Sequence, residues 1–478
     1  MTFLVVVLLE QVILHMELLH AFSLDQPHNV AQVLGDVVVV TLEAAARDPE
    51  VLRKLVQFLK THVAHHVAPL APLEPPDRFV NKDGHTSQDV MQSVRRATMW
   101  SVDAPISGYC EPRFAAVRDA FAANFAEHGE VGAAVSIIVA GEVVVDLVGG
   151  WQDEACTIPW QADTLVNFYS VGKALGATLV LQLVDEGVLS LDTRVGEFWP
   201  EFAEGGKEAV TVRHALSHQA AVPAIRTLLT DDDLWQWETM TAALAATPAW
   251  WPIGTRHAYH TNSYGHLVGE IVRRVTGEMP GARFARLRAE RGLDVWFGVP
   301  HEEQLRCAEV IWAPRGALAP SVFDGLEGDL LMSALAHFNP PGYSSIGLVN
   351  TPEWRASGIP STSGHGTARG VAAFYAALLG DDPLLSPALL HEASHPQSIG
   401  YCPMLNDEMS FGLGFQPTTA RRPFSPGPNS FGHFGTGGAV GLADPDTGVA
   451  LGYVMNHVIP RWQSSRNRAL IDTLYTCL

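Results

Sequence analysis

The chain places its clearest β-strand patterns at the two ends of a long segment whose middle has helical patterns. Residues 132–151, GAAVSIIVAGEVVVDLVGGW, contain two β-rich runs around the turn pair Ala140 and Gly141. Residues 429–460 return to glycine-punctuated strands, whereas residues from about 170 to 290 are mostly helical by pattern. Strands at both ends with helices between them predict an α+β fold, in which a sheet domain carries a helical subdomain and a cleft lies between the two.

The first 22 residues, MTFLVVVLLEQVILHMELLHAF, are strongly apolar. They lack a basic start and a small-residue cleavage site, and Glu10, His15 and Glu17 interrupt the apolar run. We expect a helix with a wide apolar face that packs on the protein or on a partner, and membrane association is not expected. An export or anchoring role is the alternative.

A second N-terminal helix is expected over residues 48–67, where an N-cap aspartate and a proline precede an apolar face. Prolines and clustered polar residues then predict an exposed linker near residues 68–90. The chain thus divides into an N-terminal helical extension and linker, residues 1–105, and a second domain, residues 106–478.

The charge and cysteine content exclude several classes of function. Lys and Arg number 31 against 51 Asp and Glu, and the resulting net charge of −20 repels nucleic acid and anionic membrane surfaces. The five cysteines are scattered and show no C-x-x-C spacing, which argues against a disulfide framework and a zinc cluster. A reducing compartment, the cytoplasm, fits this usage best.

Ser170 and Lys173 stand three residues apart at the start of an apolar segment, in NFYSVGKALGATLVLQLVDEG. Residues 173–184 predict a buried helix that ends at Gly187. At its first turn, free backbone N–H groups would stabilise an alkoxide at Ser170, and the i, i+3 spacing would bring the Lys173 amine beside it. By itself S-x-x-K is a weak motif, because a lysine at a helix start can simply extend its amine to solvent.

Further segments occur together with this motif in a recognisable order. They are GAAVSIIVAGEVVVDLVGGW, DTLVNFYSVGKALGATLVLQLVDEG, VTVRHALSHQAAVPA, WWPIGTRHAYHTNSYGHLVGEIVRRVTG, GHGTARGVAAFYAAL and FGHFGTGGAVGLADPDTGVALGYVMN. In these segments the chain resembles the serine β-lactamase and penicillin-binding-protein-like hydrolases over about residues 110–478, particularly the class C-like branch with the family VIII carboxylesterases. The resemblance implies a β-lactamase/transpeptidase-like fold, an antiparallel sheet flanked by helices with a helical subdomain.

The resemblance also implies roles for individual residues. Ser170 becomes the nucleophile that forms an acyl-enzyme, Lys173 its basic neighbour, and Tyr259 the tyrosine of the family's Y-x-N motif. A phenolate beside a lysine ammonium costs less free energy, so Tyr259 and Lys173 could share the serine proton. The family's asparagine is replaced by Thr261, with Asn262 next to it, which leaves the contact made by that asparagine open.

In place of the family's K-T-G motif the chain has His433, Phe434 and Gly435. By the resemblance, Gly435 allows substrate to approach the backbone, and the N–H groups of Thr436 and Ser170 form the oxyanion hole. His433 is expected at the substrate-binding wall. Because histidine is largely neutral at pH 7 and phenylalanine donates no hydrogen bond, uncharged esters are favoured over β-lactams. A structural hydrogen-bonding role is the alternative for His433.

No metal or cofactor is expected. His214 and His218 have an i, i+4 spacing, but no H-E-x-x-H context and no third ligand accompany them. The segment HFGTGG lacks the G-K-[ST] ending of a phosphate-binding loop, and the G-x-S-x-G motif of α/β-hydrolases is absent from the sequence.

The sequence therefore predicts a cofactor-free serine hydrolase, a carboxylesterase for small or medium acyl chains. On the same scaffold a β-lactamase, D-peptidase or amidase is the alternative. An alternative from a different functional class is a non-catalytic scaffold protein whose first hundred residues mediate association. The N-terminal extension could also join copies of the chain into a homo-oligomer.

Overall fold

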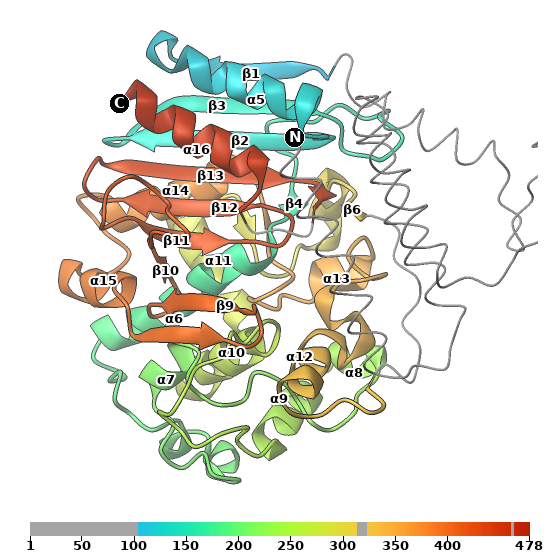
Figure 1. Ribbon diagram of the computed structural model, residues 1–478, viewed down its shortest axis with the longest axis vertical. Coiled ribbons are helices and arrows are strands. Elements are labelled where there is room, and N and C mark those ends of the chain that lie inside the picture. The colour runs from blue at the N-terminus through green and yellow to red at the C-terminus, as the bar shows by residue number, and fades with distance from the viewer. Residues whose placement is uncertain (1–103, 313–322, 460–462) are drawn as a thin grey trace, which may run out of the picture. The chain divides into compact units, whose positions relative to one another are not determined.

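The computed structural model describes residues 104–312, 323–459 and 463–478 (Figure 1). The two helices and the linker expected in the N-terminal extension lie outside these residues. That part of the sequence analysis therefore stays a prediction.

A seven-stranded antiparallel sheet in the order β1-β3-β2-β13-β12-β11-β10 forms one part of the fold (Figure 1). Strand β2 (Gly132–Val139) pairs with β13 (Val449–Met455), so strands far apart in the sequence lie side by side. This pairing confirms that both strand-rich segments belong to one sheet. The other strands are β1 (Ile106–Cys110), β3 (Glu142–Gly150), β10 (Gln416–Pro417), β11 (Phe431–Phe434) and β12 (Val440–Asp444).

The hairpin between β2 and β3 turns at the predicted pair of residues. Ala140 and Gly141 have φ angles of 49° and 86°, the left-handed values that a tight two-residue hairpin turn requires at both central positions. The Ala140 N–H donates a 2.9 Å hydrogen bond to the carbonyl of Gly448, in the turn between β12 and β13. The two turns thus stabilise each other at the same end of the sheet.

Helices cover both faces of the sheet: α5 (Ala115–Glu127), α14 (Ala368–Leu379) and α16 (Ser465–Cys477). A Cβ on Gly149 of β3 would lie 2.8 Å from a ring of α5, and one on Gly452 of β13 would lie 2.3 Å from a carbonyl of α14. These glycines pair with Ala133 and Ser136 of β2. Since positions three apart on a strand point to opposite faces, α5 and α14 pack on opposite sides.

The remaining helices form the helical part of the fold (Figure 1). They are α6 (Gly172–Asp185), α7 (Val212–Leu216), α8 (Asp231–Leu234), α9 (Trp237–Ala246), α10 (Ser263–Thr276), α11 (Pro280–Arg291), α12 (Gly328–Phe338), α13 (Pro352–Ala356) and α15 (Pro387–Ser394). Helix α6 matches the predicted buried helix, contacts β11, α10 and α11, and is followed by Gly187 with φ of 72°. It therefore joins the helical part to the sheet.

Short strands complete the described chain. They are β4 (Val166–Asn167), β5 (Val295–Trp296), β6 (Ile311–Trp312), β7 (His365–Gly366), β8 (Ser398–Cys402), β9 (Asp407–Phe411) and β14 (His457–Val458). The antiparallel hairpin of β8 and β9 was not predicted from the sequence. Among the helices of the described ranges, none combines the length and the apolar composition that a membrane span requires.

Candidate active site

Ser170 lies in a 3-10 turn, Tyr169–Val171, that leads into α6. Tyr169 adopts a left-handed conformation with φ of 51°, which is unfavourable for a residue with a side chain. Its hydroxyl lies 3.2 Å from Ser345 Oγ, and its ring meets the Trp312 ring edge-on at 6.2 Å. These contacts hold the strained residue, and with it the position of the Ser170 side chain.

The Lys173 amine is buried beside Ser170. Its Nζ lies 3.0 Å from Ser170 Oγ, 2.6 Å from the carbonyl of Thr261 and 3.2 Å from the carbonyl of Ser361. Burial lowers the pKa of Lys173 well below its usual value. A neutral amine has two N–H donors and one lone pair, and the two carbonyls can only accept. Its lone pair is then left for the Ser170 hydroxyl, which is the arrangement of a nucleophile and its base.

Tyr259 approaches the same serine from another element. Its hydroxyl interacts with Ser170, and Lys173 Nζ lies 4.7 Å from the centre of its ring. Burial raises the pKa of Tyr259, against a smaller lowering by the hydrogen bond with Ser170. A phenolate stabilised by a lysine ammonium was expected from the sequence. Burial disfavours both charges, so the geometry favours a neutral phenol beside a neutral amine.

The unpredicted hairpin anchors Tyr259. The Tyr259 N–H donates a 3.2 Å hydrogen bond to Sγ of Cys402 on β8, and its ring stacks on Phe411 of β9 at 5.8 Å and 14°. The ring of His218 contacts both of these rings, 4.9 Å from that of Tyr259 and 4.5 Å from that of Phe411. Because the backbone and the ring are both held, the phenolic oxygen has little freedom to leave Ser170.

His433 and Gly435 occupy places different from those expected. His433 is 1% exposed, and its Nδ1–H donates a 2.7 Å hydrogen bond to the carbonyl of Phe434. Burial lowers its pKa to about 3. A Cβ on Gly435 would lie 2.3 Å from the carbonyl of Phe168. The glycine thus allows β11 to approach the segment that carries Ser170, whereas the sequence analysis expected it to admit substrate.

The Y-x-N variation is explained by contacts of the two neighbouring residues. Thr261 offers its carbonyl to Lys173, while its buried Oγ1 has no hydrogen-bond partner among the described residues. The Asn262 amide instead donates to the carbonyl of Ala336 at 2.8 Å and to Ser344 Oγ at 2.9 Å. Asn262 therefore ties the active-site segment to the end of α12.

Ser361 is a functional position that the sequence analysis missed. Its carbonyl accepts from Lys173, and its Oγ donates a 2.6 Å hydrogen bond to the carbonyl of Asn262. Since the contact to lysine is made by the backbone, no side-chain pattern could have indicated it.

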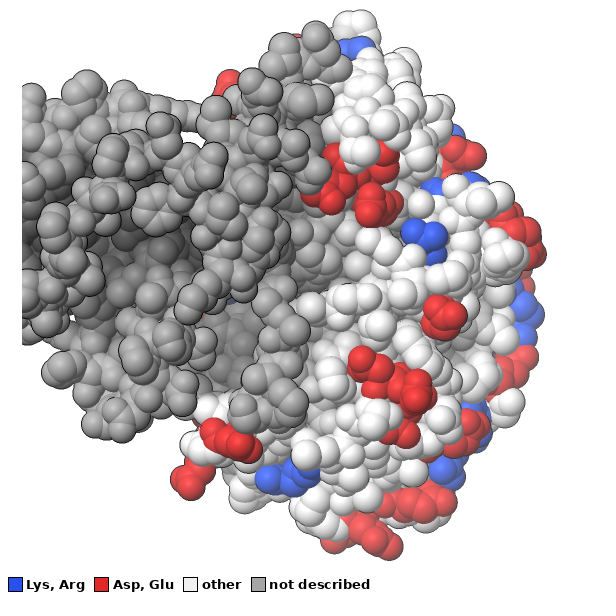
Figure 2. Space-filling view, turned by 90° about the vertical axis from the view of Figure 1, so that its right-hand side faces the viewer, with Lys and Arg blue, Asp and Glu red and all other residues white. Residues whose placement is uncertain are grey.

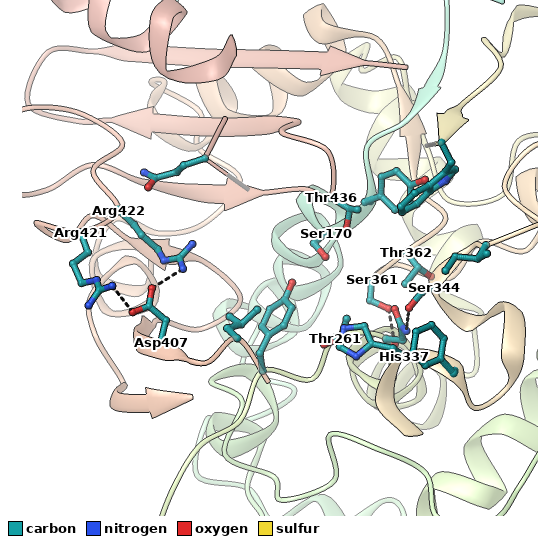
Figure 3. A pocket seen from close by; sticks show the side chains of 18 residues that line it. Ser170, Thr261, His337, Ser344, Ser361, Thr362, Asp407, Arg421, Arg422 and Thr436 are labelled. Carbon is teal, nitrogen blue, oxygen red and sulfur yellow. Dashed lines mark hydrogen bonds and ion pairs between the residues drawn. The ribbon is translucent and has the colours of Figure 1, made fainter. Parts of the chain in front are cut away.

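Ser170, Tyr259 and Thr436 line one pocket of about 590 Å³ (Figure 3). His433 and Gly435 do not line it. Its other lining residues are Tyr169, Thr261, Asn262, Trp312, His337, Phe338, Ser344, Ile346, Ser361, Thr362, Leu405, Asp407, Arg421, Arg422 and Gln463. The volume is that of a site for a small organic molecule.

The paired histidines of the sequence are not arranged as metal ligands. Nδ1 of His214 lies within hydrogen-bonding distance of the backbone and hydroxyl of Thr211 at the start of α7. His218 is buried in the aromatic cluster around Tyr259. No group of three or more His, Cys, Asp or Glu side chains in the described part of the chain could hold a metal ion.

Residues 117–474 match the protein family described as beta-lactamase. The chain belongs to the beta-lactamase family. It is 31% identical over 375 residues to esterase/beta-lactamase LipL of Mycobacterium tuberculosis, a match that covers 74% of this chain and 83% of that protein. The family resemblance expected from the ordered sequence segments is confirmed.

Solved structures of this family have the same fold. A family VIII carboxylesterase is 35% identical with a TM-score of 0.71, and a penicillin-binding protein homolog from Caulobacter crescentus is 37% identical with a TM-score of 0.70. Each match covers 78% of this chain and 100% of the other. The β-lactamase/transpeptidase-like fold is thereby confirmed.

Proposed function

We propose that the protein is a serine hydrolase that cleaves carboxylic esters of small or medium acyl chains through an acyl-enzyme at Ser170. The observation that carries the proposal is the position of Lys173 Nζ, 3.0 Å from Ser170 Oγ and hydrogen-bonded to two carbonyls. The relatives named as an esterase/beta-lactamase and as a family VIII carboxylesterase support the ester-cleaving reaction.

In acylation, Ser170 Oγ attacks the ester carbonyl carbon while the neutral Lys173 amine accepts the serine proton. The new C–O bond gives a tetrahedral intermediate with a negatively charged oxygen. When the bond to the alcohol oxygen breaks, the Tyr259 hydroxyl donates its proton to that oxygen and regains one from Lys173. The alcohol leaves, and the acyl group stays on Ser170.

The backbone N–H groups of Ser170 and Thr436 would hold the negatively charged oxygen. Both residues line the pocket, and the close approach of Gly435 to Phe168 brings their two segments together. Donors fixed by the fold before the reaction stabilise such charge without reorganisation. Water then attacks the acyl-enzyme, its proton passes to Lys173 and on to Ser170, and the acid is released.

The proposal is tested with p-nitrophenyl butyrate and a fluorophosphonate probe. Ser170→Ala should abolish both hydrolysis and covalent labelling, because the attacking oxygen is gone, and unchanged turnover would refute the mechanism. Comparing the hydrolysis of nitrocefin with that of the ester distinguishes a β-lactamase from an esterase. We expect the ester to be preferred, since the residue in place of the family's lysine is the buried His433.

For location and assembly we propose a cytoplasmic protein that associates through residues 1–105. The free state of Cys110, Cys156, Cys307, Cys402 and Cys477 supports a reducing compartment. Association is supported by the apolar run in the first 22 residues. A chain that begins near residue 100 should elute at a smaller assembly size than the full chain in gel filtration, and identical assembly states would contradict the proposal.

A further inference from the structure

A pair of arginines stands at one end of the active-site pocket. Arg421 NH2 lies 2.9 Å from one carboxylate oxygen of Asp407, and Arg422 NH2 lies 2.8 Å from the other. Arg422 and Asp407 are largely buried, whereas Arg421 is mostly exposed. One carboxylate thus binds both guanidinium groups, and both arginines line the pocket. We name Asp407, Arg421 and Arg422 the arginine cluster.

The arginine cluster gives the pocket a local positive charge. Two guanidinium groups against one carboxylate leave a surplus of one positive charge, and no other lining residue within the described part of the chain carries a permanent charge. The chain as a whole has a net charge of −20, and acidic side chains predominate on the face shown in Figure 2. An anionic ligand is therefore repelled by the net charge of the chain and attracted at this end of the pocket.

The position of the cluster assigns it to one side of the reacting ester. Figure 3 shows Asp407, Arg421 and Arg422 on one side of Ser170 and Thr436, with His337 and Ser344 on the other. Asp407 begins β9, whose last residue, Phe411, stacks on Tyr259. Residues four apart on a strand share a face and stand about 13 Å apart. The arginine cluster thus continues the wall of the pocket that begins at Tyr259.

Tyr259 marks the side of the leaving alcohol. In the proposed mechanism its hydroxyl, which lines the pocket with Ser170 and interacts with it, gives a proton to the alcohol oxygen. That oxygen must then lie next to Tyr259, and the rest of the alcohol extends along β9. His337 and Ser344 lie at the opposite end of the pocket (Figure 3), and the lining residues Phe338 and Ile346, close to them in the chain, offer apolar surface for the acyl chain.

We propose that the arginine cluster binds a carboxylate carried by the alcohol part of the ester. The inference rests on the proposed esterase function and adds the class of substrate: esters of hydroxy acids. A guanidinium group binds a carboxylate through parallel charge-assisted hydrogen bonds, so Arg422, held by Asp407, presents a prepared donor group. His433 and Phe434 favoured uncharged esters in the sequence, whereas the net positive charge of the arginine cluster favours an anionic alcohol part.

The test compares para-carboxyphenyl butyrate with para-carbamoylphenyl butyrate, which has the same shape and a neutral group. The wild-type protein should prefer the carboxylate ester in kcat/KM, mainly through a lower KM. Arg422→Gln should lower this preference about tenfold, and Arg421→Gln less because it is more exposed. Arg422→Lys should keep part of the preference, and added salt should weaken it.

Arg286→Gln is the matched control, because Arg286 forms an exposed ion pair with Glu278 and does not line the pocket. It should leave the preference unchanged. The inference is overturned if the wild-type protein does not prefer the carboxylate ester, or if neither arginine variant reduces the preference.

Monophenyl glutarate and phenyl pentanoate test the other side of the ester. A preference for the glutarate that disappears in Arg422→Gln would place the carboxylate on the acyl side and overturn the assignment. Failure of the proposed function gives a different result, because neither butyrate ester would then be cleaved at Ser170. If the wild-type protein hydrolyses the carbamoyl ester and Ser170→Ala does not, the proposed function holds and only the carboxylate assignment is in question.

Discussion

The backbone N–H of His260 donates a 3.1 Å hydrogen bond to Nδ1 of His218, whose ring packs 4.9 Å from that of Tyr259. His218 has φ of 64°, so a residue with a side chain is kept in a left-handed conformation inside the core. Since the N–H occupies Nδ1, His218 is held neutral, in agreement with the lowering of its pKa by burial. The contact fixes the residue that follows Tyr259 in the chain.

His218 should stabilise the segment around Tyr259 through its acceptor nitrogen. His218→Phe keeps an aromatic ring and removes the acceptor, so the buried N–H of His260 loses its partner at a cost of about 1–3 kcal/mol. The midpoint of thermal unfolding should fall, and kcat should fall because Tyr259 is less well held. His218→Asn should retain most of the thermal stability and most of kcat, since asparagine tolerates the left-handed conformation and offers an acceptor. Equal behaviour of the two variants would contradict this role.

Acid should unfold the protein through its buried histidines. Burial lowers the pKa of four of them to between about 3 and about 4: His260, His266, His365 and His433. Below the unfolded pKa of about 6.5 the unfolded chain binds protons that the folded chain does not, so each histidine reduces the free energy of unfolding by about 1.4 kcal/mol per pH unit. Denaturant unfolding followed by circular dichroism should show stability falling steeply from pH 6 toward pH 4. A free energy of unfolding that does not change between pH 6 and pH 4 would contradict this role of the buried histidines.

Gly435 should be essential for the approach of β11 to the Ser170 segment. In Gly435→Ala the new methyl group would lie 2.3 Å from the Phe168 carbonyl, so the two backbones must separate. We expect kcat/KM to fall more than about tenfold, as for loss of one oxyanion donor. Gly380→Ala is the control, because Gly380 has φ of −74° and its nearest neighbour atom would be 3.7 Å away. Comparable losses in both variants would refute the steric argument.

The sequence predicted the parts of the fold that depend on local pattern. The β2–β3 hairpin follows from two β-rich runs around a turn pair, and α6 follows from an apolar run that ends at Gly187. The β8–β9 hairpin could not be predicted in this way, because SIGYC and DEMSF contain a single β-branched residue, Ile399. That hairpin is held by tertiary contacts, including the one between Cys402 and Tyr259.

The candidate site was predictable to the same extent. Ser170, Lys173 and Tyr259 were expected together from the family resemblance, and the structure brings them into contact. The sequence indicated that burial lowers the pKa of Lys173. It did not indicate that burial also raises the pKa of Tyr259. His433 is buried in part by the ring of Tyr259, whose centre lies 6.2 Å from that of the His433 ring, and this contact joins residues far apart in the sequence.

Tyr259→Phe separates proton donation from packing. The variant keeps the ring that packs on Phe411 and His218 and loses the hydroxyl. Hydrolysis of an ethyl ester, whose alkoxide needs a proton to leave, should slow about a hundredfold, as for loss of a general acid. A p-nitrophenyl ester should be affected less, because p-nitrophenolate leaves without a proton. Equal losses on the two esters, with thermal stability unchanged, would show that Tyr259 does not protonate the leaving group.

Lys173 should act as a base only when neutral. Lys173→Met and Lys173→Arg should both reduce kcat by about a thousandfold, since methionine has no basic nitrogen and arginine stays protonated. In the wild-type protein, kcat should rise with pH through the lowered pKa of Lys173 and then level off. Lys207 provides the control, because it is also buried and donates to two carbonyls at 2.6 Å. Lys207→Met should lower thermal stability and leave the pH dependence of kcat unchanged. Retention of activity in Lys173→Arg would rule out Lys173 as the proton acceptor.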